Sequence, residues 1–190
     1  MMGYVWYAGY GSNLHEQRFA CYITGGTPQF SKRAAKGCAD GSLPTKNRPL
    51  VIPHRLYFAL PDGKSSTENW GEGGVAFVDP RVDPNAGTLC RIWRITTDQY
   101  GEVRQQEGRR WYDEEVQLGI EHGEPIVAIT NRVVLANLCR PSDAYLRTIA
   151  LGLKEMFEFD DDQVVAYLLE KEGVKGRFRH QELLSAISWP

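Results

Sequence analysis

The sequence lacks the cysteine pattern of a disulfide-bonded or metal-binding protein. Its 190 residues include four scattered cysteines, none in a CxxC pair: Cys21, Cys38, Cys90 and Cys139. Cysteines so placed are typical of reduced thiols that pack as small hydrophobic side chains. The four histidines are also isolated, with no metal-ligand spacing among themselves or to the cysteines. We therefore expect no metal site and a cytoplasmic location.

Long apolar runs and an excess of charge of one sign are absent too. No stretch approaches the roughly 20 apolar residues of a membrane span, and the N-terminus has no basic start of a secretion signal. The formal net charge is −2, with both signs interspersed along the chain. A nucleic-acid footprint or a polybasic membrane patch would concentrate positive charge. We expect a small-molecule partner, and neither nucleic acid nor a membrane.

The order of the predicted elements indicates one α+β domain. Strand-like segments occupy most of the first two thirds of the chain, and helical spacing dominates the last third. Such segregation predicts a mainly antiparallel, closed sheet with helices packed outside it. The predicted strands are 5–10, 34–39, 50–60 with a break near Pro53, 75–78, 89–95, 112–118 and 126–135. The predicted helices are 14–20, 97–107, one that begins after Ser142 and one around 164–169.

A glycine-containing loop follows the first predicted strand. Its sequence is Tyr10-Gly11-Ser12-Asn13-Leu14. Gly11 lets a ligand approach the main chain, and Ser12 or Asn13 can cap a helix that begins at Leu14. Loop amides beside a helix N-terminus suit a carboxylate or a developing oxyanion. An ordinary strand-to-helix connection would use the same residues. A dinucleotide fingerprint would need glycine in place of Leu14.

Glu107 is the second informative residue, at the predicted C-terminal end of helix 97–107. The negative end of a helix dipole disfavours a carboxylate and tends to raise its pKa, and burial acts in the same direction. A general base benefits from such a shift. Arg104 and Arg110 flank Glu107 at three-residue spacing. A solvated ion-pair patch is therefore the alternative interpretation.

Taken together, three segments resemble the gamma-glutamylcyclotransferase family. They are the loop 10–14, Gln106-Glu107-Gly108 with Tyr112 soon after it, and Pro141 to Leu146 opening a helix that carries Gly152. The likeness covers roughly residues 7–169. It implies a small mixed, mainly antiparallel β-barrel with flanking helices. It also implies release of 5-oxoproline from a gamma-glutamyl amide, without a metal or an organic cofactor.

The resemblance implies a role for each matching residue. The chain would be a single domain over 1–190, with a helical extension from about residue 170. Glu107 would be the catalytic acid and base for attack of the substrate's α-amine on its γ-carbonyl. The substrate-binding residues would be Tyr10, Gly11, Ser12, Asn13, Leu14, Tyr112 and Tyr145, with Tyr10 and Tyr112 as walls or hydroxyl donors.

Two other functions fit the same residues. One is a non-catalytic module that binds a small acid or a protein on this fold, and the other is a related amide hydrolase or acyl transferase. The sequence indicates neither the leaving amine nor an oligomeric state. Loops 25–49 and 61–74 would build the pocket for that amine, and loops vary most where specificity is set.

Overall fold

The computed structural model describes residues 3–61, 63–108 and 110–188. Residue 62 of the predicted loop 61–74, and residues 1, 2, 109, 189 and 190 of the predicted single domain, lie outside them. The strands are β1 (Tyr4–Gly9), β2 (Asn47–Ile52), β3 (Leu56–Ala59), β4 (Ser66–Thr67), β5 (Gly71–Glu72), β6 (Val75–Val78), β7 (Thr88–Thr96), β8 (Glu114–Glu121) and β9 (Glu124–Thr130). The helices are the 3-10 helix η1 (Ser12–Leu14), α1 (Glu16–Thr24), α2 (Thr97–Glu107), α3 (Asp143–Phe157), α4 (Asp161–Leu169) and α5 (His180–Ile187).

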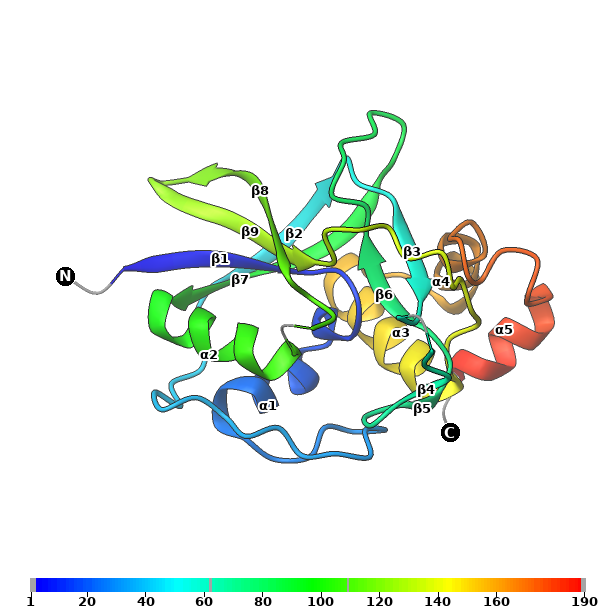
Figure 1. Ribbon diagram of the computed structural model, residues 1–190, viewed down its shortest axis with the longest axis horizontal. Coiled ribbons are helices and arrows are strands. Elements are labelled where there is room, and N and C mark those ends of the chain that lie inside the picture. Colours follow the sequence, from blue (N-terminus) through cyan, green and yellow to red (C-terminus); the bar gives the residue numbers. More distant parts are fainter. Residues whose placement is uncertain (1–2, 62, 109, 189–190) are drawn as a thin grey trace.

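A five-stranded sheet in the order β2-β7-β1-β9-β8 forms the centre of the fold. Its pairs are antiparallel except β1 with β9, which is parallel. Side chains alternate across β1, as a strand buried on both faces requires. Tyr7 belongs to the core cluster that includes Phe19 of α1 and Val103 of α2, whereas Trp6 belongs to the cluster that includes Ile149 and Leu153 of α3. Figure 1 accordingly shows α1 and α2 on one side of the sheet, with α3, α4 and α5 gathered near β3 and β6.

The predicted α+β class and mainly antiparallel pairing are confirmed, but the closed barrel is not found among the described residues. The sheet ends at β8 and β2, and β3 pairs with β6 in a separate two-stranded sheet. Where β9 meets β6, the two strands are joined by the Thr130 hydroxyl and not by main-chain hydrogen bonds. It accepts from the Val78 N–H at 3.2 Å and donates to the Val78 carbonyl at 2.6 Å. A side chain therefore joins the two sheets where a barrel would have main-chain pairing.

Three predicted elements differ from those in the structure. The helix expected at Leu14 is two elements, because η1 ends there and α1 begins after His15 without a side-chain cap. Segment 34–39 makes only an isolated bridge from Ala35 to Gly26. The last predicted strand stops at Thr130, as β9, rather than at residue 135.

Helix ends with strong capping signals lie where the sequence indicates. Thr96 and Gln99 form a reciprocal capping box at the start of α2, and Gly108 ends that helix at φ 85°. The Ser142 hydroxyl accepts from the Tyr145 N–H at the start of α3, and Asp160 caps α4. The predicted C-terminal extension contains α5 (His180–Ile187).

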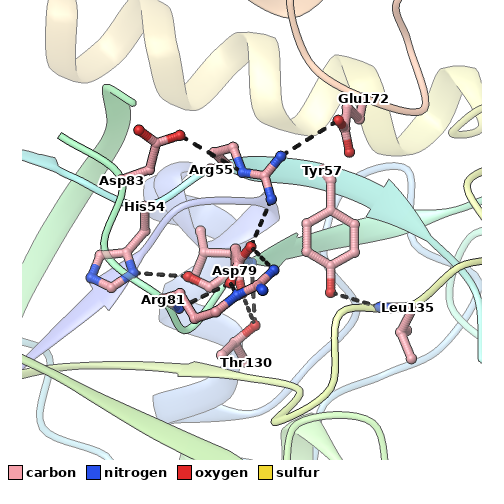
Figure 2. Close-up of polar contacts among 10 residues, drawn as sticks. His54, Arg55, Tyr57, Asp79, Arg81, Asp83, Thr130, Leu135 and Glu172 are labelled. Atoms are coloured by element: carbon pink, nitrogen blue, oxygen red, sulfur yellow. Dashed lines mark hydrogen bonds and ion pairs between the residues drawn. The ribbon is translucent and has the colours of Figure 1, made fainter. Parts of the chain in front are cut away.

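A charged cluster fixes the turn that follows β6 (Figure 2). The Asp79 side chain, 3% exposed, accepts from the Arg81 main-chain N–H at 2.9 Å and from the Arg55 and Arg81 guanidinium groups at 2.8 Å each. His54 Nδ1 lies 2.8 Å from the Asp79 carbonyl oxygen. Hydrogen bonds from Arg81 hold the pKa of the Asp79 carboxyl well below its usual range.

We expect Asp79→Asn to lower the free energy of unfolding by about 1–2 kcal/mol at pH 7. The substitution keeps one acceptor oxygen, and both arginines are largely exposed, which limits the cost. Because the folded-state pKa is lowered, this stability is present above the unfolded carboxyl pKa of about 3.9 and is lost as the pH falls below it. Urea unfolding at pH 7 and pH 3 tests this. The control Asp83→Asn, 3.9 Å from Arg55, should change stability by less than about 0.5 kcal/mol.

Candidate active site

A cavity of about 100 Å³ lies where the end of β1, η1, the end of α2, β6 and α3 meet. Glu107 and the loop residues Gly11, Ser12 and Asn13 line it together. Tyr10, Tyr112 and Tyr145 form further parts of its wall. Residues almost a hundred positions apart thus converge on one hollow.

Close packing around η1 explains the two glycines at the end of β1. A Cβ atom at Gly11 would lie 2.7 Å from the Tyr145 hydroxyl oxygen and 2.9 Å from the Ala76 Cβ. A Cβ atom at Gly9 would lie 2.8 Å from the Asn13 carbonyl oxygen. All three distances are shorter than a normal contact, so only glycine lets the chain turn this sharply beside α3 and β6.

Asn13 connects the loop to Glu107. Its side-chain Nδ2 donates to Glu107 Oε1 at 2.5 Å and to the Tyr7 hydroxyl oxygen at 2.9 Å. The Tyr7 hydroxyl donates to the same Glu107 oxygen at 3.3 Å. The indole N–H of Trp93 donates to the Asn13 carbonyl oxygen at 2.9 Å and so anchors the main chain of the turn. The side chain of Asn13 is therefore used to orient the carboxylate and does not cap α1.

Burial raises the pKa of Glu107. The positive charge of Arg18 and hydrogen bonds from Asn13, Tyr22 and Tyr7 act in the opposite direction and favour the carboxylate. The alternative of a solvated patch with Arg104 is not formed, because the Arg104 guanidinium lies 3.3 Å from Glu115. Glu107 instead faces Asn13 in the cavity, held by neutral donors. An enclosed carboxylate of this kind can accept and return a proton.

The hydroxyl groups of three lining tyrosines are bonded to the main chain. Tyr10 donates to the Ile129 carbonyl at 2.6 Å, and Tyr112 donates to the Ala76 carbonyl at 3.0 Å. The Tyr145 hydroxyl oxygen accepts from the Ala76 N–H at 3.1 Å. Tyr10 and Tyr112 are thus placed as walls, because their hydroxyl protons are already committed.

Comparison with known proteins identifies the fold. The chain superposes on a gamma-glutamyl cyclotransferase with a TM-score of 0.60 at 18% identity, over 96% of this chain and 98% of that one. This chain has the gamma-glutamyl cyclotransferase-like fold. An uncharacterized protein from Homo sapiens gives 0.58 at 19% identity over 96% and 98% of the two chains. A glutathione-specific gamma-glutamyl cyclotransferase from yeast gives 0.51 at 13% identity over 97% and 96%.

Sequence comparison adds one relative of a different name. Histone deacetylase 5 from Arabidopsis thaliana is 30% identical over 202 residues, a match that covers 86% of this chain. The match spans only 30% of that protein's length. No established family profile matches the chain.

Within this gamma-glutamyl cyclotransferase-like fold, one predicted site residue lies away from the cavity. Leu14 is fully buried and packs against Gly152 of α3, so it fixes the turn against α3. Sequence reasoning also missed lining residues that neighbouring elements supply: Tyr7, Tyr22, Asn69, Trp70, Gln106 and Trp111. Tyr7 could have been identified from the sequence, because the alternation of side chains along β1 places it on the face of the sheet that α2 covers.

Two features are absent from the described part of the chain. Within 3–61, 63–108 and 110–188, no group of three or more His, Cys, Asp or Glu side chains is placed to hold a metal ion. In the same part of the chain, no helix has the length and apolar character needed to cross a membrane.

Proposed function

We propose that this protein is a gamma-glutamyl cyclotransferase, which releases 5-oxoproline and a free amine from a gamma-glutamyl amide. One observation carries the proposal. The Glu107 carboxylate, enclosed and held by Asn13 at 2.5 Å, shares a cavity with the turn that begins η1. The gamma-glutamyl cyclotransferase-like fold supports the same activity.

The start of η1 supplies donors for the glutamyl group. The first N–H groups of a helix have no partner within that helix. Here they belong to Ser12, whose N–H faces the Tyr145 hydroxyl, and to Asn13. They suit the negative charge of the substrate, or of the γ-oxygen once the tetrahedral intermediate forms. Preset donors of this kind are commonly worth about 3 kcal/mol in the transition state.

Glu107 would take a proton from the α-ammonium of the substrate, because an ammonium nitrogen has no lone pair with which to attack. Asn13 Oδ1 is buried and has no hydrogen-bond partner within the protein. This oxygen and the Glu107 carboxylate offer two acceptors for one ammonium group. The amine lone pair then attacks the γ-carbonyl carbon, and a five-membered ring closes by a new carbon–nitrogen bond. Because both groups belong to one molecule, proximity is already supplied.

The intermediate then breaks the original amide bond between the γ-carbon and the departing nitrogen. The electron pair of that bond leaves with the nitrogen, which takes the proton held by Glu107. The attacking nitrogen, which is positively charged once the ring closes, gives its surplus proton to the Glu107 carboxylate, and this proton also passes to the released amine, which departs as an ammonium ion. Glu107 thus returns to its starting state, and the γ-oxygen becomes the ring carbonyl of 5-oxoproline. The tyrosine walls hold the glutamyl chain folded and limit the entry of water.

Product analysis across a panel of gamma-glutamyl amides tests the proposal. The panel should include amides of amino acids, dipeptides, simple alkylamines and polyamines, each incubated with purified protein. We expect 5-oxoproline in amounts equal to the free amine. Free glutamate would indicate hydrolysis instead. No turnover of any amide by a folded protein would favour a binding module.

A further inference from the structure

Arg18 of α1 is a buried cation next to Tyr22 in the wall of the cavity. It is 3% exposed, and its guanidinium lies 4.3 Å from the centre of the Tyr22 ring and 5.5 Å from that of Trp70. None of the ion pairs formed by the described residues involves Arg18 or Glu107. Buried charges are costly unless an opposite charge offsets them. The charge of Arg18 acts on the enclosed Glu107 carboxylate, so each offsets the other.

The Tyr22 hydroxyl connects these two charges. Arg18 Nη2 donates to the hydroxyl oxygen at 2.7 Å, and the hydroxyl is hydrogen-bonded to the Glu107 carboxylate. A guanidinium can only donate and a carboxylate can only accept, so both directions are fixed. The hydroxyl oxygen accepts from Arg18, and its proton is donated to Glu107. Burial and the charge of Glu107 raise the pKa of Tyr22, which keeps this proton on the hydroxyl.

The helix α1 places Arg18 and Tyr22 side by side. The two residues are four positions apart, so their side chains lie on one face of the helix. Gln106, which precedes Glu107, donates from its side-chain nitrogen to the Tyr22 main-chain carbonyl at 2.9 Å. This bond ties the end of α1 to the end of α2. The arrangement therefore has a fixed position relative to the carboxylate.

Arg18 opposes two effects that disfavour the Glu107 carboxylate. Burial raises the pKa of Glu107, and the positive charge of Arg18 lowers it. That charge has a larger effect than any of the hydrogen bonds that Glu107 accepts. Glu107 also ends α2, where the helix dipole disfavours a negative charge. A carboxylate must be ionised before it can take a proton from the substrate.

We propose that Arg18 is a positioning residue for the reaction, which acts through the Tyr22 hydroxyl to hold the Glu107 carboxylate ionised and directed into the cavity. This inference rests on the proposed cyclotransferase activity. Arg18 is not among the residues that line the cavity, so it acts on the reaction only through its neighbours. Its loss should therefore change the pH dependence of turnover as well as the rate.

The other titratable groups that face Glu107 are tyrosines. Burial raises the pKa of each, so they stay neutral below about pH 9. They are Tyr7 of β1, Tyr10 after β1, Tyr112 between α2 and β8, and Tyr145 of α3. Arg104, on the same helix as Glu107, is paired with Glu115. Among these groups, only Glu107 can produce the acid limb of kcat/KM.

The pH profile of Arg18→Met tests the proposal. Loss of the charge should raise the pKa of Glu107 and move the acid limb of kcat/KM to higher pH. We expect the ratio of kcat/KM at pH 8 to that at pH 5 to rise about fivefold. Arg18→Lys keeps the charge and should keep this ratio within about twofold of the wild type. The control Lys175→Met removes an exposed charge between α4 and α5 and should leave the ratio unchanged.

Tyr22→Phe tests the connection. It removes one donor to Glu107 and should raise the same ratio about threefold. Because Arg18 acts through this hydroxyl, a variant with both Arg18→Met and Tyr22→Phe should show less than the product of the two single effects. An effect equal to that product would overturn the role of Tyr22 as the connection.

A direct titration follows Glu107 without turnover. NMR of protein labelled at the glutamate side-chain carboxyl carbons reports the midpoint of each group, and the Glu107 signal is the one missing from Glu107→Gln. We expect its midpoint at higher pH in Arg18→Met than in the wild type. An unchanged midpoint, with an unchanged pH profile, would overturn the proposal. If Arg18→Met fails to fold, the same result in Tyr22→Phe would overturn it.

The two measurements also separate this inference from the proposed function. Absence of 5-oxoproline from every amide of the panel would overturn the cyclotransferase activity and, with it, the part of Arg18 in that reaction. The titration midpoint would still decide whether Arg18 holds Glu107 ionised. Release of 5-oxoproline with the same pH profile and midpoint in folded Arg18→Met would overturn the role of Arg18 alone.

Discussion

Glu107→Gln should lower kcat/KM for 5-oxoproline release about a thousandfold. The amide cannot accept a proton from the substrate ammonium, nor return one to the departing nitrogen. Its side-chain oxygen can still accept from Asn13 Nδ2, so the cavity keeps its shape. The measurement is steady-state release of 5-oxoproline, with circular dichroism as the check on folding.

The same substitution should not weaken the fold. Burial raises the folded-state pKa of Glu107, so the ionised carboxylate costs stability at any pH above that pKa. Gln removes this cost, and Glu107→Gln should be at least as stable as the wild type at pH 7. The difference should vanish below the unfolded-state carboxyl pKa of about 4.3, where both states are protonated. Chemical denaturation at pH 7 and pH 4 measures it.

A matched control separates the role of Glu107 from a general effect of removing a carboxylate. Glu114 begins β8 and does not line the cavity. Glu114→Gln should keep near-normal turnover. Ordinary turnover by Glu107→Gln would reject the catalytic assignment. The acid limb of wild-type kcat/KM is a second check, because a raised pKa places it above about pH 4.3.

The parts of this fold that could be predicted from sequence are those fixed by neighbouring residues. The reciprocal bonds of Thr96 and Gln99 begin α2, and Gly108 ends it, so Glu107 could be placed at a helix end. The turn at Gly11 was recognisable for a similar reason. Local capping and turn chemistry act over three or four residues, and a sequence shows them directly.

The parts that could not be predicted depend on contacts between distant segments. Nothing near Thr130 shows that its hydroxyl will bond Val78 and leave the sheet open there. The sequence shows Arg18 only as an arginine on a helix, whereas in the structure it is buried with its guanidinium against the rings of Tyr22 and Trp70. The position of Asn13 in the sequence predicts that it caps a helix, but its side chain donates to the distant Glu107 instead.

Gly152→Ala should lower the free energy of unfolding by about 2 kcal/mol, although alanine is the better helix former by about 1 kcal/mol. A Cβ atom at Gly152 would lie 2.4 Å from the Leu14 Cβ and 2.5 Å from the His15 main-chain nitrogen. Neither atom is the end of a flexible side chain, so α3 must move away from η1. Overpacking of this kind commonly costs about 1–3 kcal/mol, and here the close main-chain contact places the cost at the upper end.

A second helical glycine provides the opposite expectation. Nothing lies within 4 Å of a Cβ atom built at Gly101 in α2, so Gly101→Ala should stabilise the fold by about 0.5–1 kcal/mol. Urea denaturation of both variants compares them in one experiment. Because η1 carries Ser12 and Asn13, Gly152→Ala should also reduce 5-oxoproline release, whereas Gly101→Ala should not. A Gly152→Ala variant as stable as Gly101→Ala would show that α3 does not hold the turn in place.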